Sequence, residues 1–170
     1  APQKSLLRVL LYELLNFHIE INRFISCHYL LASMYVDIHC HLDDKAFEDL
    51  EPILAKAKAA GVKAIISNGT NLPSNEAVKG ICERFPIVRP AYGLYPTEQS
   101  DDDAAVINWI RVEARGKFPP VAIGEIGLDG VESVTEAQRQ RFQAMCILAN
   151  ELAIPVIIHS RKAEQEVYDE

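Results

Sequence analysis

Three polar residues recur at every second position in the stretch 35–41, at Asp37, His39 and His41. Alternate side chains of a β-strand share a face, so a strand that begins at Tyr35 would place all three on one side. Two imidazoles at this spacing lie close enough to bind one ion, and neutral imidazole is a common ligand of zinc and other divalent transition metals. The pattern alone also fits the polar face of an edge strand.

Two more residues of ligand type, Glu125 and His159, each end a later apolar run. In a parallel α/β fold the carboxyl ends of the strands meet at one edge, where active sites are built. Taken singly, Glu125 could cap a neighbouring helix and His159 could be a histidine of the core. Together with His39 and His41, they predict a metal site.

Short β-branched runs alternate with helical stretches from Met34 onward, and the runs are nearly all apolar, as expected of strands covered on both faces. The expected strands are 35–39, 62–67, 87–92, 121–125 and 156–159. The expected helical faces between them consist of Phe47, Leu50, Leu54 and Ala57, and of Phe142, Met145, Ala149 and Leu152.

Three signals mark helix ends. Ser133 and Glu136 have the spacing of a capping box, and Ser100 precedes three aspartates that suit the positive end of a helix. Gly61 follows the first helical face and suits a helix C-terminus. These signals predict helices that begin near 100 and 133 and a helix that ends before 61.

Five strands that alternate with helices require parallel pairing with right-handed crossovers. An open doubly wound sheet and part of a (β/α)8 barrel both satisfy this requirement. A complete barrel needs roughly 250 residues, so the stretch 34–170 would supply about half of one. The last helical stretch stops at Glu170, and we therefore expect a fragment.

Residues 1–33 differ from the rest and form a separate expected unit. Their apolar positions alternate spacings of three and four, which predicts an amphipathic helix. These positions are Leu7, Leu10, Leu14, Phe17, Ile21 and Phe24. Charged residues interrupt the apolar run too often for a transmembrane span or a signal peptide, so we expect ordinary helix packing and no membrane partner. The second expected unit is 34–170.

The composition is that of an ordinary globular protein, with 49% hydrophobic and 24% charged residues. The net charge of -7 provides no overall attraction for nucleic acid, so a phosphate substrate would need a local feature such as bound metal ions. The cysteines form no C-x-x-C pair, which favours free thiols and a reducing, cytoplasmic location. They are Cys27, Cys40, Cys82 and Cys146.

Three motifs resemble, in order and separation, the N-terminal signatures of the TatD family of metal-dependent hydrolases and deoxyribonucleases. They are Asp37-Ile38-His39-Cys40-His41-Leu42-Asp43, Gly124-Glu125-Ile126-Gly127-Leu128-Asp129 and Pro155-Val156-Ile157-Ile158-His159-Ser160-Arg161. The resemblance covers 34–170 and none of 1–33. A His-x-His strand alone also suits other amidohydrolase-like barrels, but the Gly-Glu-Ile-Gly-Leu-Asp segment argues against them.

The resemblance implies a TIM-type (β/α)8 barrel, of which this chain holds the first four to five βα units. It also implies two divalent metal ions, Mg²⁺, Mn²⁺ or Zn²⁺. His39 and His41 would bind one ion, Glu125 would bridge both, and His159 would bind the second. Family members complete the site with a histidine and an aspartate from later strands, which would lie beyond Glu170.

Two positions depart from the family pattern. The family commonly has Gly-x-His-Pro where this chain has Gly93-Leu94-Tyr95-Pro96, and aromatic residues after Gly-Leu-Asp are replaced by Gly130-Val131-Glu132. A phenol cannot replace an imidazole as a metal ligand or as a base near neutral pH, so the first departure affects substrate contacts.

The function implied is hydrolysis of DNA phosphodiester bonds by a two-metal mechanism, with Glu125 and Arg161 as catalytic residues. Arg161 would hold a phosphate oxygen, and an ion pair with an acidic helix face is the alternative. Asp37 and Asp129 could orient ligand histidines, and Asp129 could instead cap a turn before Gly130.

Two other functions stay open. One is a non-catalytic protein that associates with itself through the open sheet edge or the N-terminal helix. The other is a metal-dependent hydrolase of amides or esters. Metal content separates the first from the enzymes, and turnover of single-stranded DNA against a panel of amides separates the two enzymes. The fragment itself could be inactive.

Overall fold

The computed structural model describes residues 34–98 and 102–170. The amphipathic helix expected over 1–33, the separate unit it would form, Cys27 and the helix-start signal at Ser100 lie outside the described residues. The other expectations can be compared with the fold. Within the described residues, none of the helices is long and apolar enough to cross a membrane.

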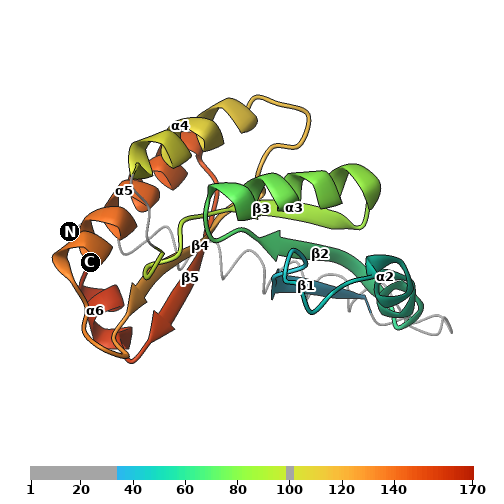
Figure 1. The fold of residues 1–170 in the computed structure, drawn as a ribbon, viewed down its shortest axis with the longest axis horizontal. Coiled ribbons are helices and arrows are strands. Elements are labelled where there is room, and N and C mark those ends of the chain that lie inside the picture. The colour runs from blue at the N-terminus through green and yellow to red at the C-terminus, as the bar shows by residue number, and fades with distance from the viewer. Residues whose placement is uncertain (1–33, 99–101) are drawn as a thin grey trace, which may run out of the picture. The chain divides into compact units, whose positions relative to one another are not determined.

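The described part of the chain is built on one parallel sheet of five strands, ordered β1-β2-β3-β4-β5 (Figure 1). The strands are β1 (Tyr35–Cys40), β2 (Val62–Asn68), β3 (Val88–Tyr92), β4 (Ala122–Asp129) and β5 (Val156–Arg161). A doubly wound sheet reverses its strand order at a switch point, whereas a barrel adds strands in sequence. The sequential order therefore identifies part of a TIM-type barrel and confirms the expected fold class.

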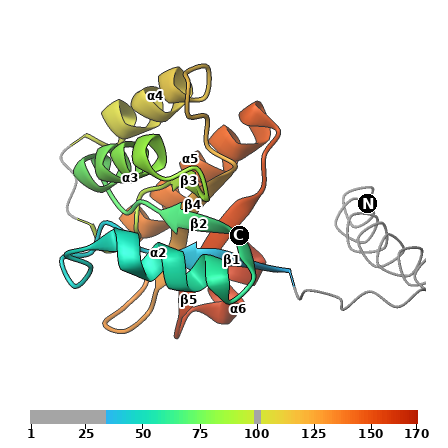
Figure 2. The ribbon, with the colours of Figure 1, turned by 90° about the vertical axis from the view of Figure 1, so that its right-hand side faces the viewer.

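Helices alternate with these strands and lie on one side of the sheet (Figures 1 and 2). They are α2 (Leu50–Ala59), α3 (Leu72–Arg84), α4 (Asp103–Glu113), α5 (Glu136–Leu152) and α6 (Glu164–Asp169). α3 packs on β2 and β3, α5 packs on β4, and α4 packs beside α5. The apolar pattern did not predict α3, because its buried face includes the polar residues Ser74 and Asn75.

Two of the expected helix starts are wrong. The N-cap of α5 is Thr135, whose side chain accepts a hydrogen bond from the backbone of Gln138, and Ser133 precedes it. α2 begins after Asp49, so Phe47 lies outside the helix and is 37% exposed. A capping side chain must reach the free N–H groups of the first turn. The residues directly before the helices, Thr135 and Asp49, therefore serve as the N-caps. Gly61 follows the end of α2 with a φ of 96°, as predicted.

The core lies where the helices cover the central strands. Every residue of β4 is buried, and Ile123 and Leu128 are fully buried there. The expectation that all strands are covered on both faces is wrong for β1, where Val36 and Ile38 are 55% and 62% exposed. β1 and β5 each have one neighbouring strand among the described residues, whereas β2, β3 and β4 have two. The three described cysteines, Cys40, Cys82 and Cys146, are free thiols.

Candidate metal centre

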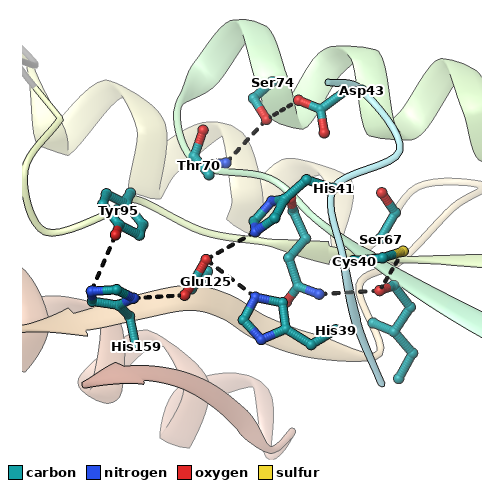
Figure 3. Close-up of polar contacts among 12 residues, drawn as sticks. His39, Cys40, His41, Asp43, Ser67, Thr70, Ser74, Tyr95, Glu125 and His159 are labelled. Atoms are coloured by element: carbon teal, nitrogen blue, oxygen red, sulfur yellow. Dashed lines mark hydrogen bonds and ion pairs between the residues drawn. The ribbon is translucent and has the colours of Figure 1, made fainter. Parts of the chain in front are cut away.

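The two histidines of the first motif converge on one carboxylate oxygen. His39 Nε2 lies 3.2 Å from Glu125 Oε2, and His41 Nε2 lies 3.1 Å from the same oxygen (Figure 3). Their rings meet edge to face, with 5.2 Å between centroids. His39 lies in β1 and His41 follows directly after its last residue, Cys40, and both imidazoles reach one point.

The backbone of β2 sets the orientation of the His41 ring. His41 Nδ1 lies 2.8 Å from the carbonyl oxygen of Asn68, the last residue of β2. A carbonyl can only accept, so Nδ1 donates this hydrogen bond and Nε2 keeps a lone pair when the ring is neutral. Such a bond on the far ring nitrogen is what orients histidines that bind metals.

The expected strand 121–125 placed Glu125 at its end. In the structure β4 runs on to Asp129, so Glu125 lies inside the strand. β4 pairs with β3 only at Ala122 and Ile123 and then continues beside β5 alone as far as Asp129. Glu125 thus lies beyond the end of β3, at an irregularity in the β4–β5 ladder, and is 4% exposed.

The two oxygens of Glu125 face different histidines. Oε2 faces His39 and His41, whereas Oε1 lies 3.0 Å from His159 Nδ1 (Figure 3). His159 belongs to β5, so side chains from three strands meet at one buried carboxylate. The geometry brings together the four residues that the sequence singled out.

These contacts shift two pKa values. Burial opposes ionisation of Glu125, but its hydrogen bonds with His41, His39 and His159 outweigh burial and lower its pKa to about 2. The hydrogen bond with Glu125 raises the pKa of His41, burial opposes that rise, and the carbonyl of Asn68 adds to it. Glu125 is therefore ionised throughout the physiological range.

The donor set suits a divalent cation. Single ligand atoms of His39, His41 and Glu125 all lie within 4.8 Å of one another, so an ion between them could touch all three. Imidazole nitrogen and carboxylate oxygen bind Zn²⁺ and Mn²⁺. His159, on the other oxygen of Glu125, lies outside this group of three.

Glycines allow the strands to approach closely around Glu125 and His159. Gly127 has a φ of +146°, and a Cβ there would lie 2.0 Å from the backbone oxygen of His159. A Cβ on Gly93, at the end of β3, would lie 2.4 Å from the backbone nitrogen of Glu125. A side chain at either position would push a candidate ligand out of place.

Asp37 and Asp129 play different parts. Asp37 Oδ1 accepts a hydrogen bond from the backbone of His39 at 3.1 Å and, among the described contacts, meets no histidine ring. Asp129 Oδ2 lies 3.0 Å from His159 Nε2, while Oδ1 accepts from Val131 N. Asp129 therefore contacts the histidine and caps the turn at once. The hydrogen bond from the backbone of Val131 is the largest of the causes that lower the pKa of Asp129.

The guanidinium of Arg161 forms no ion pair or hydrogen bond with another residue in 34–98 or 102–170. The ion pair with an acidic helix face that the sequence left open is therefore not formed within these residues. Arg161 lines a cavity of about 580 Å³ beside Asp129 and Tyr95. Its charge acts on the nearby carboxylate of Asp129 and is among the causes that lower the pKa of that group, although the two form no ion pair.

Sequence reasoning missed two features of the site. The Tyr95 hydroxyl lies 3.1 Å from His159 Nε2, although Tyr95 is 64 positions away and was considered only as a departure from a pattern (Figure 3). Asp43 lies beside His39 and His41, accepts a hydrogen bond from the Ser74 hydroxyl, and has a buried Oδ1 without a partner. Its place two residues after His41 was the available signal.

Comparisons with known proteins identify the family to which this chain is similar. A family model described as TatD related DNase matches residues 36–170. The chain is 35% identical over 130 residues to the 3′-5′ ssDNA/RNA exonuclease TatD of Klebsiella pneumoniae, covering 75% of this chain and 49% of the relative. It is 30% identical over 142 residues to an uncharacterized metal-dependent hydrolase of Methanocaldococcus jannaschii, covering 79% and 54%.

A solved structure is similar as well. The crystal structure of YJJV, a TatD homolog from Escherichia coli K12, superposes with a TM-score of 0.70 at 31% identity, covering 81% of this chain and 54% of that one. The chain spans about half the length of the curated relatives that it matches.

Proposed function

The chain belongs to the TatD related DNase family, and from this premise we propose that its residues form part of an active site that hydrolyses DNA phosphodiester bonds with two divalent metal ions. One observation carries the proposal: the buried carboxylate of Glu125 presents one oxygen to His39 and His41 and the other to His159. A carboxylate shared in this way suits two neighbouring cations better than one.

In this proposal His39, His41 and Glu125 would hold the first ion, and Glu125 and His159 would hold the second. Bound divalent ions make water more acidic and neutralise charge on a phosphoryl group. The residues of this chain keep the two positions close together, because one side chain serves both. Asp129 orients His159 through its other ring nitrogen.

Arg161 acts on the substrate in this proposal. It lies two residues after His159, at the carboxyl end of β5, and its guanidinium forms an ion pair with no carboxylate in the described part of the chain. A guanidinium can donate two parallel hydrogen bonds to a phosphate, which fixes the position of the phosphate as well as neutralising it. We therefore assign Arg161 to holding the scissile phosphate.

DNA is proposed as the substrate because the Klebsiella relative is named as an exonuclease on single-stranded DNA and RNA. RNA and amide substrates are the alternatives that the test must separate. The metal proposed is Mg²⁺, Mn²⁺ or Zn²⁺. A cytoplasmic location is proposed from the free thiols of the described cysteines.

The test extends the chain beyond Glu170 with the C-terminal half of the Klebsiella relative. We expect the extended protein to cleave single-stranded DNA with Mn²⁺ or Mg²⁺, and the 170-residue chain alone to cleave it at least a hundredfold more slowly, because misplacing a reacting group by about 1 Å has that effect. Glu125→Gln should abolish cleavage. Glu151→Gln, an exposed glutamate of α5 paired with Arg111, is the matched control. Cleavage of RNA or amides but not DNA would overturn the substrate assignment.

Self-association is a second candidate function, favoured by the exposed strand β1. Tyr35, Val36 and Ile38 are each more than half exposed on a strand that has one neighbour among the described residues. An exposed apolar edge strand is a template for pairing with another chain. We propose a homo-oligomer joined through this strand, with or without activity.

A further inference from the structure

We propose that the cavity between the loop after β3 and the loop after β4 binds one nucleotide of the substrate strand, with Tyr95 against its base and Arg161 on its phosphate. The proposal rests on the DNA-cleaving function and extends it to a defined binding site. It assigns a role to Tyr95 and Arg141, which the metal centre does not use.

The cavity has the size and position of a nucleotide site. Its volume is about 580 Å³, within the range of roughly 300 to 1,000 Å³ typical of ligand pockets. Tyr95 and Glu98 line it and also line the cavity of about 520 Å³ that contains His39 and His41. The nucleotide that carries the phosphate held by Arg161 could therefore place its base in this cavity, beside the metal centre.

Tyr95 separates the two cavities. Its hydroxyl lies against His159, and its ring lies 4.6 Å from the His159 ring, centroid to centroid, so the side chain is held in place (Figure 3). Aromatic rings bind bases by stacking, whatever the base. The ring of Tyr95 can stack on a base even though its phenol is neither a metal ligand nor a base near neutral pH.

The wall of the cavity is preformed by Arg141 of α5. Its guanidinium donates to the backbone oxygens of Tyr95, Pro96 and Glu98 at 3.1, 3.1 and 2.8 Å. It also donates to both carboxylate oxygens of Asp103, at 2.9 and 3.2 Å. Five hydrogen bonds thus tie the loop that carries Tyr95 to α4 and α5. A wall fixed in advance lowers the entropic cost of ligand binding.

The charges of the lining favour one phosphate and a nucleoside. Arg161 is the cation that no described residue pairs with, whereas Glu98, Asp129 and Glu132 are carboxylates. Carboxylates repel further phosphates and accept hydrogen bonds from the amino and hydroxyl groups of a nucleoside. Gln138 adds a donor, because its Oε1 accepts from Asp129 N while its Nε2 donates to none of the described residues.

The test measures binding of thymidine 5′-monophosphate to the 170-residue chain by calorimetry in EDTA, where metal plays no part. We expect this nucleotide to bind more tightly than thymidine or inorganic phosphate. Tyr95→Ala should weaken binding about tenfold or more, the loss of one stacking contact, while Tyr95→Phe keeps it within about twofold. Arg161→Gln should remove the preference for the nucleotide over thymidine.

The control is Tyr168→Ala, which removes an exposed tyrosine of α6 that lines neither cavity. Circular dichroism of each variant shows whether it folds, and Tyr95→Leu, which also removes the aromatic ring and should weaken binding to the same extent, serves if Tyr95→Ala does not fold. Equal binding by wild type and a folded Tyr95→Ala, or no binding of the nucleotide by the wild type, would overturn the proposal. A thymidine oligonucleotide should displace the nucleotide, and failure to do so would make the cavity a site for free nucleotides and overturn its role toward DNA.

Failure here is distinguishable from failure of the proposed function. Cleavage of DNA by the extended protein without nucleotide binding by the chain would remove the cavity assignment and leave the function standing. Nucleotide binding by the chain without cleavage by the extended protein would remove the proposed function and leave the cavity as a nucleotide-binding site.

Discussion

Glu125 is the residue on which the site depends, because its two oxygens serve histidines from two different strands. Its carboxylate is buried, ionised and in contact with three imidazoles. An ionised carboxylate in a buried position requires cations or strong donors around it. The imidazoles of His39, His41 and His159 surround the carboxylate in this structure, and metal ions would neutralise it in the proposed enzyme.

The first prediction concerns metal binding. Glu125→Gln should weaken Mn²⁺ binding to the 170-residue chain at least tenfold, because an amide carries no charge and offers a single oxygen. His39→Ala should have a similar effect. Calorimetric titration is the measurement, with Glu151→Gln as the control. Wild-type affinity in both site variants would remove the metal centre from these residues.

The second prediction concerns the pH dependence of stability without metal. The pKa of Glu125 falls from 4.5 to about 2, so its contribution is present above pH 4.5 and is lost as the pH falls toward 2. The pKa of His41 is raised above 6.5, so its contribution is present below pH 6.5 and is lost as the pH rises through the raised value. The free energy of unfolding in EDTA should therefore peak between about pH 4.5 and 6.5.

Urea denaturation at a series of pH values measures this profile. His41→Gln should flatten the alkaline side, because an amide does not titrate there. Saturating Mn²⁺ should also remove the alkaline loss, since the ion replaces the proton on the imidazole. An alkaline decline that persists unchanged in His41→Gln would contradict the assignment.

At the scale of elements, β4 and β5 must approach closely to bring Glu125 and His159 together. Gly127 makes this possible through a positive φ and the absence of a Cβ. A residue with a side chain would be strained at this φ, whereas glycine adopts it readily. The Gly124–Asp129 motif thus supplies a glycine that the backbone geometry requires as well as a carboxylate for the candidate metal centre.

The third prediction compares two glycines. Gly127→Ala should lower the free energy of unfolding by about 3 kcal/mol, because it combines an unfavourable φ with a backbone clash. Gly80→Ala, in α3 with open space around its Cβ, should instead raise the free energy of unfolding by about 0.5 to 1 kcal/mol. Denaturant unfolding of both variants is the measurement. Equal effects would show that Gly127 is not under steric constraint.

At the scale of the whole molecule, the described residues form a sheet with apolar side chains exposed on its first strand. Val36 and Ile38 lie on this strand, and Ile158 of β5 is 42% exposed. In a complete barrel, further strands would pair with both edges. The chain spans about half the length of its relatives, and among the described residues β1 and β5 each pair with one neighbouring strand.

The fourth prediction is that the 170-residue chain associates with itself. Light scattering should detect oligomers at micromolar concentration. Ile38→Lys should reduce association, because a charge on an edge strand opposes pairing. Ile147→Lys places the same charge at a similarly exposed isoleucine of α5 and is the control. A monodisperse wild-type monomer would contradict the prediction.

Local patterns in the sequence were sufficient to predict the five strands, the helices over 50–59 and 136–152, and the four residues around the proposed metal positions. Period-two and period-3.6 patterns depend only on nearby residues, so they are readable without a fold. The same logic failed for α3, whose buried face is partly polar, and for the capping of α5, where Ser133 and Thr135 compete within a few residues.

The sequence alone predicted that His39, His41, Glu125 and His159 would lie together and that their strands are parallel, and the structure shows both. Only the tertiary structure decided between an open sheet and part of a barrel, because strand order depends on packing across the whole chain. It also decided that Glu125 divides its oxygens between two sets of histidines, that Tyr95 meets His159, and that Arg161 lacks a partner among the described residues. These contacts join residues tens of positions apart, and no local periodicity encodes a distance between strands.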